Sequence, residues 1–186
     1  MAGSNEILLV RHGETDDNAA DRFQGQLDTH LNERGREQSR ALARRLAGEK
    51  LRALYSSPLS RARETAQIIA AELALEPVYD ARFMEADTGD WTGRPYADVI
   101  AQAPDEFAAW RSASRTFRFP GGESVCEQAA RVVAALADVR AAGLLPAVVV
   151  CHGGAIRAVP GAHRADDDFV GNCALFRLAV TAAPAS

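Results

Sequence analysis

Histidine and arginine residues stand directly after two apolar runs of the sequence. Arg11 and His12 follow Ile7–Val10, and His152 follows Ala147–Cys151. A neutral imidazole is a competent nucleophile that can form a covalent intermediate. An arginine guanidinium forms paired hydrogen bonds with phosphate or carboxylate oxygens. Together these residue types predict a site that binds an oxyanion, best suited to a phosphate, and that can carry out phosphoryl transfer.

A further arginine falls where a helix is expected to begin. Ser57-Pro58 predicts a helix start, with serine as the N-cap and proline at the first helical position. Arg61 would then lie in the first turn, where the helix dipole and the free N–H groups favour an anion. Glycines after the two histidines would let the backbone approach a ligand closely. They are Gly13, Gly153 and Gly154.

Hydrolysis of a phosphomonoester also needs a proton for the leaving alkoxide, which usually comes from a carboxyl group. The candidates are Glu14, Glu85, Asp87 and Glu123. Their spacing does not choose among them. The residues themselves therefore predict phosphoryl transfer through a histidine and leave the identity of the acid open.

The elements that must position these residues follow from hydrophobic periodicity. Short apolar runs predict strands at Ile7–Val10, Leu51–Tyr55, Ala147–Cys151 and Ala174–Val180. Apolar residues at helical spacing predict helices within Glu33–Lys50, from Ser57 to about Leu73, and from Val125 to near Gly143. This alternation implies an α/β fold, a three-layer αβα sandwich with a mostly parallel central sheet. Ligands of such sheets bind outside the carboxyl ends of the strands, where the two histidines and two arginines would meet.

The stretch from Phe83 to Phe119 differs from the rest of the chain. It holds seven of the twelve aromatic residues, together with Pro95 and Pro104. We interpret it as an excursion from the sheet, a partly helical lid over about residues 85–120 within a single domain that spans 1–186. The alternative is that its aromatic side chains only pack a satellite core.

Composition and charge exclude several functional classes. The 186 residues are 47% hydrophobic and 25% charged, as in an ordinary globular protein. The net charge of −4 argues against a general nucleic-acid binder, although 20 of the 21 basic residues are arginine. No run of apolar residues is long enough to predict a membrane span, and the N-terminal segment lacks the pattern of a secretory signal. We therefore expect a cytoplasmic protein with neither nucleic acid nor a membrane as its partner.

No metal site and no disulfide framework are expected. The three cysteines show no CxxC spacing. Cys151 adjoins His152, but consecutive strand residues face opposite sides of a sheet, so we interpret Cys151 as a buried, inert thiol. The run Asp166–Asp168 comes without other ligand types and is typical of a solvated turn.

Several segments together resemble the histidine phosphatase superfamily, also called the phosphoglycerate mutase-like family. In chain order they are LVRHGET at 9–15, FQGQLD at 23–28, SSPLSRARETA at 56–66, MEADTGDWTG at 84–93, PGGES at 120–124 and HGGAIR at 152–157. A lone RHG would be a weak signal, whereas the whole series in family order is specific. The resemblance covers nearly the whole chain, from Leu8 to about Leu178.

The resemblance implies roles for individual residues. His12 matches the nucleophile that becomes phosphohistidine, and Glu85 matches the proton donor. The other matches are the phosphate-pocket residues Arg11, Arg61 and His152, and the substrate-side residues Asn18, Gln24 and Gly25. The resemblance implies no metal ion and no nucleotide cofactor.

The leading hypothesis is a metal-independent phosphomonoesterase that hydrolyses a small phosphorylated metabolite and releases inorganic phosphate. One alternative is a phosphoglycerate mutase, which returns the phosphoryl group to its substrate. Another is a catalytically silent module that only binds a phosphorylated ligand. Family mutases that depend on a bisphosphate are generally longer, which favours the phosphatase. The oligomeric state is left open, a homodimer included.

Departures from the family pattern fall at the substrate rim and behind the second histidine. Asp17 and Thr88 stand where aromatic or apolar residues are common in the family. With Arg94 they predict a polar rim and substrates with a small polar body. Pro160-Gly161 interrupts what is normally a leucine-rich helix after His152.

Overall fold

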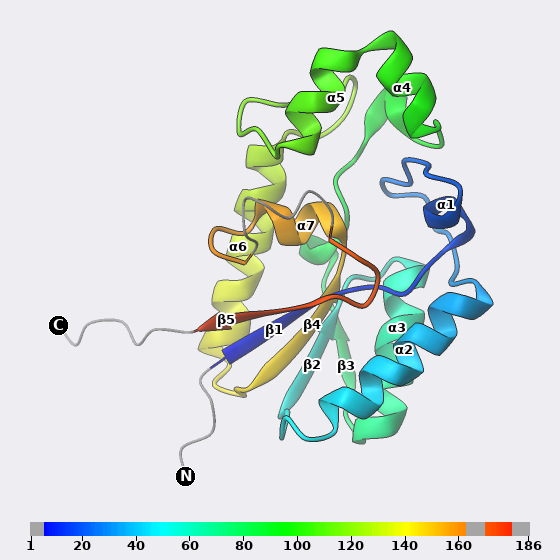
Figure 1. The fold of residues 1–186 in the computed structure, drawn as a ribbon. Coiled ribbons are helices and arrows are strands. Elements are labelled where there is room, and N and C mark those ends of the chain that lie inside the picture. Colours follow the sequence, from blue (N-terminus) through cyan, green and yellow to red (C-terminus); the bar gives the residue numbers. More distant parts are fainter. Residues whose placement is uncertain (1–5, 163–169, 180–186) are drawn as a thin grey trace, which may run out of the picture.

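A computed structural model describes residues 6–162 and 170–179. Its centre is a five-stranded sheet with the strand order β3-β2-β4-β1-β5 (Figure 1). The strands are β1 (Glu6–Arg11), β2 (Ala53–Ser56), β3 (Pro77–Tyr79), β4 (Ala147–Cys151) and β5 (Leu175–Ala179). All neighbours pair in parallel except β1 and β5, which are antiparallel. The predicted mostly parallel sheet is confirmed.

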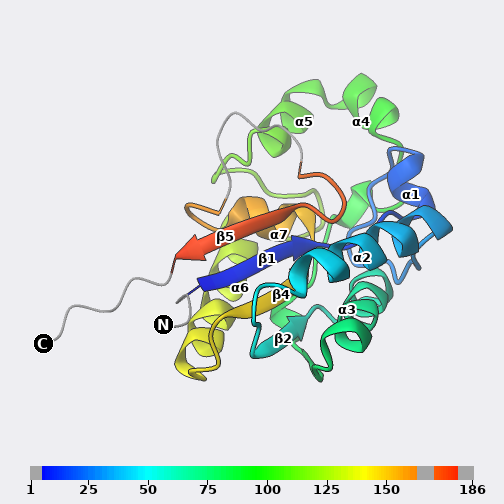
Figure 2. The ribbon, with the colours of Figure 1, turned by 60° about the horizontal axis from the view of Figure 1, so that its bottom comes forward.

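Helices cover both faces of this sheet (Figures 1 and 2). On one face lie α2 (Glu33–Leu46) and α3 (Ser60–Leu73), and on the other lie α6 (Val125–Ala141) and α7 (Gly153–Ala158). Side chains of β1 alternate between the two layers: Leu8 and Val10 join the buried cluster of α2 and α3, whereas Ile7 and Leu9 join that of α6 and α7. This alternation follows from the two-residue period of a strand. The predicted three-layer αβα sandwich is therefore confirmed.

The register of the two central strands decides where the site forms. Arg11, the last residue of β1, lies opposite Cys151, the last residue of β4. The next residue of each strand is a histidine, and the N–H of His12 donates to the carbonyl of Cys151 at 3.1 Å. The pairing of β1 with β4 therefore places His12 and His152 side by side at the carboxyl end of the sheet.

The predicted start of the helix that carries Arg61 is wrong by two residues, because Pro58 is not its first helical position. The helix α3 begins at Ser60 with Leu59 as an extended N-cap that has no side-chain cap hydrogen bond. Ser57 does not cap it because its N–H continues the sheet by donating to Val150, and its hydroxyl contacts His152. Other predicted elements differ from the observed ones by a few residues at their ends. The helix α7 ends at Ala158, as expected of a chain that continues into Pro160-Gly161.

Residues 83–119, which we call the cap, lie over the carboxyl end of the sheet (Figure 1). The cap includes two short helices, α4 (Tyr96–Gln102) and α5 (Pro104–Arg111), after two 3-10 turns at Ala81–Phe83 and Gly89–Trp91. A helix of one turn, α1 (Asp16–Ala19), lies beside it. Six of the seven cap aromatics form or pack against a separate buried cluster around Phe23, which the N-terminal loop supplies, whereas Phe83 packs in the cluster of α6 and α7. The aromatic stretch is thus a satellite core, and it also stands over the site.

None of the helices in the described ranges is long and apolar enough to cross a membrane.

Candidate active site

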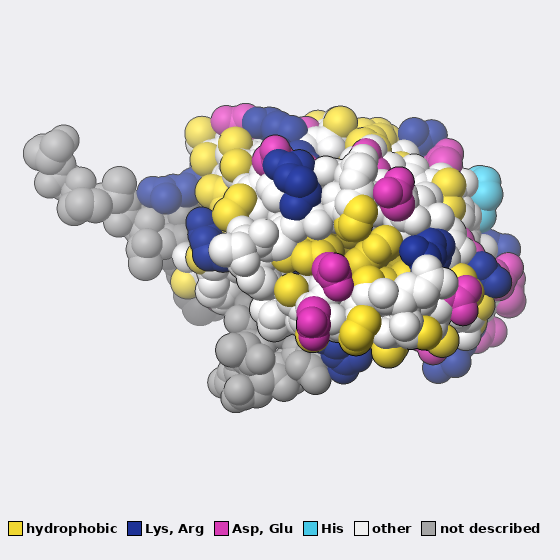
Figure 3. Space-filling view, turned by 90° about the horizontal axis from the view of Figure 1, so that it is seen from above, with side chains coloured by type: hydrophobic (Ala, Val, Ile, Leu, Met, Phe, Trp, Pro, Cys, Tyr) yellow, Lys and Arg dark blue, Asp and Glu magenta, His cyan; other side chains and the backbone are white. Residues whose placement is uncertain are grey.

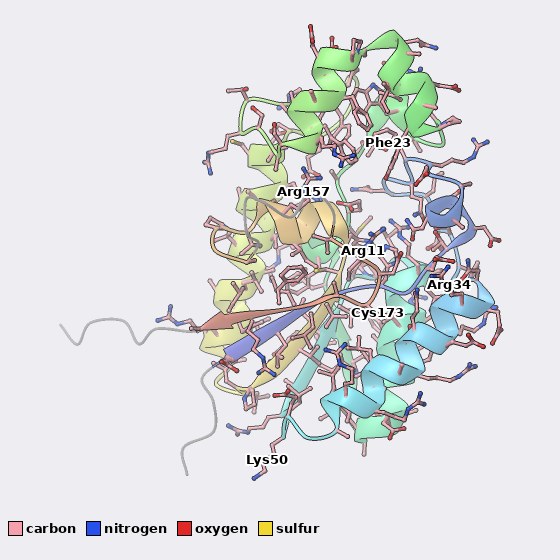
Figure 4. All side chains as sticks on the ribbon, viewed as in Figure 1. Arg11, Phe23, Arg34, Lys50, Arg157 and Cys173 are labelled. Carbon is pink, nitrogen blue, oxygen red and sulfur yellow. The ribbon has the colours of Figure 1, made fainter. Side chains whose placement is uncertain are left out.

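A cavity that is open to solvent lies between the carboxyl end of the sheet and the cap. Its lining includes almost all of the predicted site residues: Arg11, His12, Asn18, Gln24, Gly25, Arg61 and Glu85. In Figure 4, Arg11 lies at the end of the sheet, and Phe23 and Arg157 lie between it and the helices of the cap. Seen from above, with the cap nearest the viewer, hydrophobic side chains gather near the middle of the surface, with charged side chains around them (Figure 3). The predicted crevice at the strand ends is therefore present.

His12 is 2% exposed and is held in one tautomer by its own loop. Its Nδ1 lies 2.7 Å from the carbonyl oxygen of Gly13, which can only accept a hydrogen bond. Nδ1 therefore carries the proton, and Nε2 keeps its lone pair. Burial, followed by the charges of Arg61 and Arg11, lowers the pKa of His12 well below its usual value. A neutral imidazole with an unprotonated Nε2, which here accepts a hydrogen bond from Nε–H of Arg61, is the form that can attack phosphorus once a ligand takes that place.

Arg61 reaches the site from the first turn of α3 and is 1% exposed. Its Nη1 and Nη2 donate to the carbonyls of Leu27 and Gly25 at 2.7 Å each, and its Nε lies 3.3 Å from Nε2 of His12. Burial lowers the pKa of Arg61 to about 10, so the guanidinium stays charged at neutral pH. Arg11, at the end of β1, donates to the carbonyl of Val170. Two buried cations thus flank the imidazole of His12.

His152 lies behind His12 and does not line the cavity. Its side chain is fully buried, and its ring centroid is 5.1 Å from that of His12. Its Nε2 lies 2.8 Å from the hydroxyl of Ser57. Burial, with the nearby charge of Arg61, lowers the pKa of His152 well below its usual value. Both histidines are therefore neutral at neutral pH.

Glu85 is the one member of the four candidate acids that lines the cavity. One carboxylate oxygen accepts from the side chain of Gln128 at 2.8 Å and from the N–H of Ala86 at 2.9 Å. The other oxygen accepts from the N–H of Gly154 at 3.0 Å. A Cβ at position 154 would lie 2.3 Å from the carboxylate, so this glycine is needed for the close approach. The backbone and Gln128 thus aim the carboxylate into the cavity.

The other three candidate acids are engaged elsewhere. Glu123 forms an ion pair with Arg131 at 2.7 Å, and Glu14 lies 3.6 Å from Arg34. Asp87 caps the following 3-10 turn, because its carboxylate accepts from the N–H of Gly89. The geometry therefore leaves Glu85 as the carboxyl group that can reach a leaving oxygen in the cavity.

The three residues expected on the substrate side all line the cavity. The carbonyl of Gly25 binds Arg61, and its positive φ of 51° suits glycine. The side-chain oxygen of Gln24 accepts from two threonine hydroxyls, and that of Asn18 accepts from Asn172 at 3.1 Å. These amides are thus oriented by neighbours before any ligand binds.

The prediction of a polar rim is wrong for two of its three residues. Thr88 lines the cavity, but Asp17 and Arg94 do not, and Arg94 instead donates to Gln102 at 2.7 Å. The wall opposite the phosphate pocket is aromatic and consists of Phe23, Tyr96, Trp110 and Phe119. It is aromatic because the satellite core of the cap presents one side to the cavity.

Several supporting residues carry no signal in the sequence. Gln128 lies on α6 and is 3% exposed, so its amide resembles any buried polar residue of an apolar helix face. Arg157, on α7, donates to the carbonyls of Trp110 and Arg111 at the end of α5, and it stacks over the Trp110 ring at 5.4 Å. It ties the cap to the sheet layer.

The structure also bears on the predictions about metals and thiols. Within residues 6–162 and 170–179, no group of three or more histidine, cysteine or acidic side chains could hold a metal ion. The run Asp166–Asp168 lies outside the described residues. Cys151 faces the apolar cluster of α6 and α7, and burial raises the pKa of its thiol to about 12. It is the inert thiol that was expected.

Comparison with known proteins matches this geometry. The model of the histidine phosphatase superfamily (branch 1) matches residues 7–179. The chain belongs to the histidine phosphatase superfamily. Its motif residues are the ones that the fold brings together at the carboxyl ends of β1 and β4.

Similar members of the superfamily include named phosphatases. Phosphoserine phosphatase 1 of Hydrogenobacter thermophilus is 39% identical over 135 residues, which are 73% of this chain and 64% of that enzyme. Glucosyl-3-phosphoglycerate phosphatase of Mycobacterium tuberculosis is 37% identical over 168 residues, which are 86% of this chain and 75% of that enzyme. A solved structure of the mycobacterial glucosyl-3-phosphoglycerate phosphatase with VO3 is 34% identical. It superposes with a TM-score of 0.84 over 92% of this chain and 90% of that one.

Proposed function

We propose that this protein is a metal-independent phosphomonoesterase that hydrolyses a small phosphorylated metabolite through a phosphohistidine on Nε2 of His12. The observation that carries the proposal is the contact of Nδ1 with the carbonyl of Gly13. It leaves Nε2 as a neutral nucleophile beside two buried arginines. The named phosphatases among the relatives support the same reaction class.

The proposed reaction has two halves. In the first, Nε2 attacks phosphorus, the bond from phosphorus to the alcohol oxygen breaks, and Glu85 gives that oxygen its proton. In the second, a water molecule gives a proton to Glu85 and attacks phosphorus, the P–N bond breaks, and inorganic phosphate leaves. Arg11 and Arg61 offset the charge of the phosphoryl oxygens in both halves.

The substrate class follows from the cavity and from the relatives. Phosphoserine and glucosyl-3-phosphoglycerate are both phosphomonoesters whose alcohol carries a carboxylate. In this chain Arg22 and Arg157 also line the cavity, next to its aromatic wall. We propose a substrate that places its phosphate in the histidine pocket and a second anionic group near these arginines. The substrate would then be larger than the small polar molecule that the predicted polar rim implied.

Replacement of the nucleophile tests the proposal. We expect His12→Ala to lower kcat for a generic aryl phosphate by about 10⁴-fold or more, the scale seen when a nucleophile is removed. His30→Ala is the matched control, because His30 is a surface histidine that pairs with Glu64. An alkaline quench with a ³²P-labelled substrate should trap a label that is stable to base and labile to acid in the wild type and in His30→Ala, but not in His12→Ala. Wild-type turnover by His12→Ala would contradict the proposal.

The mutase alternative differs in what accepts the phosphoryl group from His12. A similar protein of Arabidopsis thaliana bears the name phosphoglycerate mutase-like protein 4. Comparing phosphate release with isomerisation of 3-phosphoglycerate separates the two activities, and we expect release to dominate. Phosphate binding without labelling or turnover would instead indicate the silent binding module.

The cytoplasmic location and a homodimer stay predictions. Cell fractionation checks the first, and light scattering checks the second.

A further inference from the structure

Ser57 and His152 form a buried pair to which the mechanism above gives no role. Both side chains are fully buried, and the hydroxyl of Ser57 lies 2.8 Å from Nε2 of His152. The other ring nitrogen, Nδ1, is buried without a hydrogen-bond partner among the described residues. His152 does not line the cavity, but its ring centroid is 5.1 Å from that of His12, so a phosphoryl group held at His12 is the ligand that could supply the missing partner.

The neighbours of Ser57 indicate the direction of its hydrogen bond. The N–H of Leu59 donates to the Ser57 hydroxyl oxygen at 3.3 Å, so an acceptor position of that oxygen is already used. The hydroxyl proton still needs an acceptor, and Nε2 of His152 is within reach. If the hydroxyl donates to Nε2, then Nε2 is unprotonated and the single proton of the neutral imidazole is on Nδ1. The reverse direction would bury the hydroxyl proton without an acceptor.

We infer that Ser57 is a positioning residue that fixes the Nδ1–H tautomer of His152, so that His152 presents a hydrogen-bond donor to a phosphoryl oxygen. The inference rests on the proposed phosphatase function. The tautomer matters because a lone pair at Nδ1 would repel a phosphoryl oxygen, whereas an N–H would bind it. The ring stays neutral chiefly because it is buried, and next because Arg61 places a charge of the same sign as an imidazolium beside it.

The tautomer is tested directly in the free protein. Histidine ¹⁵N NMR of the wild type should show a protonated Nδ1 and an unprotonated Nε2 for His152, with resonances assigned by their loss in His152→Asn. In Ser57→Ala the Nε2 loses its donor, and we expect its chemical shift to move toward that of a protonated nitrogen. A wild-type spectrum with the proton on Nε2 would overturn the inference, whatever the activity.

Kinetics test the consequence for turnover. We expect Ser57→Ala to lower kcat by about 10-fold, the loss of one hydrogen bond to a charged oxygen, with KM changed less than kcat. Ser56→Ala is the matched control, because Ser56 is equally buried but donates to the carbonyl of Ser57. Its kcat should stay within about 2-fold of the wild type, below the effect of a lost bond to substrate.

The two proposals fail in different ways. A wild-type protein that hydrolyses no phosphomonoester contradicts the phosphatase function, while the NMR result still decides the tautomer. A Ser57→Ala variant with the melting temperature and the kcat of the wild type overturns the role of Ser57 and leaves the phosphatase function untouched. If Ser57→Ala does not fold, the wild-type spectrum decides.

Discussion

His12, at the floor of the cavity, and His152, buried behind it, follow adjacent parallel strands, whereas the roof over them consists of two short helices held by aromatic side chains. At the floor, the backbone fixes the side chains: Gly13 orients His12, and the carbonyls of Gly25 and Leu27 hold Arg61. In the roof, side chain packs on side chain. The comparison separates a histidine and arginine pocket that the backbone holds from an aromatic wall that packing holds.

Phe23 is where the two regions meet, and its loss should have the largest effect. Its ring is 3% exposed and lies within 5.0 Å, centroid to centroid, of Trp91, Tyr96 and Trp110. We expect Phe23→Ala to lower the free energy of unfolding by about 3–5 kcal/mol, as for a buried phenylalanine, with Phe23→Leu costing less. Urea denaturation measures this difference.

Hydrogen exchange of the same variant would sharpen the comparison. If packing alone holds the roof, amides of α4 and α5 should exchange faster in Phe23→Ala than in the wild type. Amides of β1 and β4 should remain the slowest to exchange in both proteins. Equal acceleration in both regions would show that floor and roof open as one unit, and the comparison would not hold.

A pair of adjacent glycines tests the floor. A Cβ at Gly154 would lie 2.3 Å from a carboxylate oxygen of Glu85, whereas one at Gly153 would meet only Arg11, at an ordinary 3.7 Å. We expect Gly154→Ala to lower kcat by about 10²-fold through displacement of Glu85, a typical contribution of general acid catalysis. Gly153→Ala is the matched control in the same helix. Equal kinetics in the two variants would contradict the placement of Glu85.

The smallest expected effect is on stability as a function of pH. The pKa values of His12 and His152 are lowered in the folded protein, chiefly by burial. Below the usual histidine pKa of about 6.5 the unfolded chain binds protons that the folded one does not, so stability falls as the pH drops. The slope is about 1.4 kcal/mol per pH unit for each histidine.

Urea unfolding between pH 7 and pH 5.5 measures this slope, and His12→Asn should remove about half of it, because one of two histidines is lost. A free energy of unfolding that does not change over this range would mean that the floor tolerates charged imidazoles. The neutral nucleophile of the proposed mechanism would then be in doubt.

The sequence predicts the floor better than the roof for a physical reason. Runs such as Ala147–Cys151 are apolar throughout because both faces of the strand are covered, and the histidine after each run marks the strand end. Only the family resemblance identifies Glu85 among the four candidate acids. The carboxylate of Glu85 is held by Gln128 and Gly154, which are distant in sequence, so the neighbouring residues give no sign of it. Local spacing cannot show which of several carboxylates such partners will hold.

The roof and the start of α3 could not be predicted from local pattern. Asp17 and Arg94 are polar residues near the site in sequence, yet the aromatic cluster turns one side to the cavity and excludes them from its lining. Ser57 followed by proline has the pattern of a helix N-cap, but its hydroxyl binds His152 instead. In both cases a tertiary contact overrides a local preference.

The strand order has a consequence for the synthesis of the chain. The strand β1 pairs only with β4 and β5, which both lie in the last quarter of the described chain, and β4 is also the partner that joins β2 to β1. A nascent chain on the ribosome therefore holds an unpaired apolar β1 until β4 has emerged. Contacts of such long sequence separation form slowly. No truncated product that stops before β4 can bring the two histidines together, so activity arises only after Ala147–Cys151 and His152 have been synthesised.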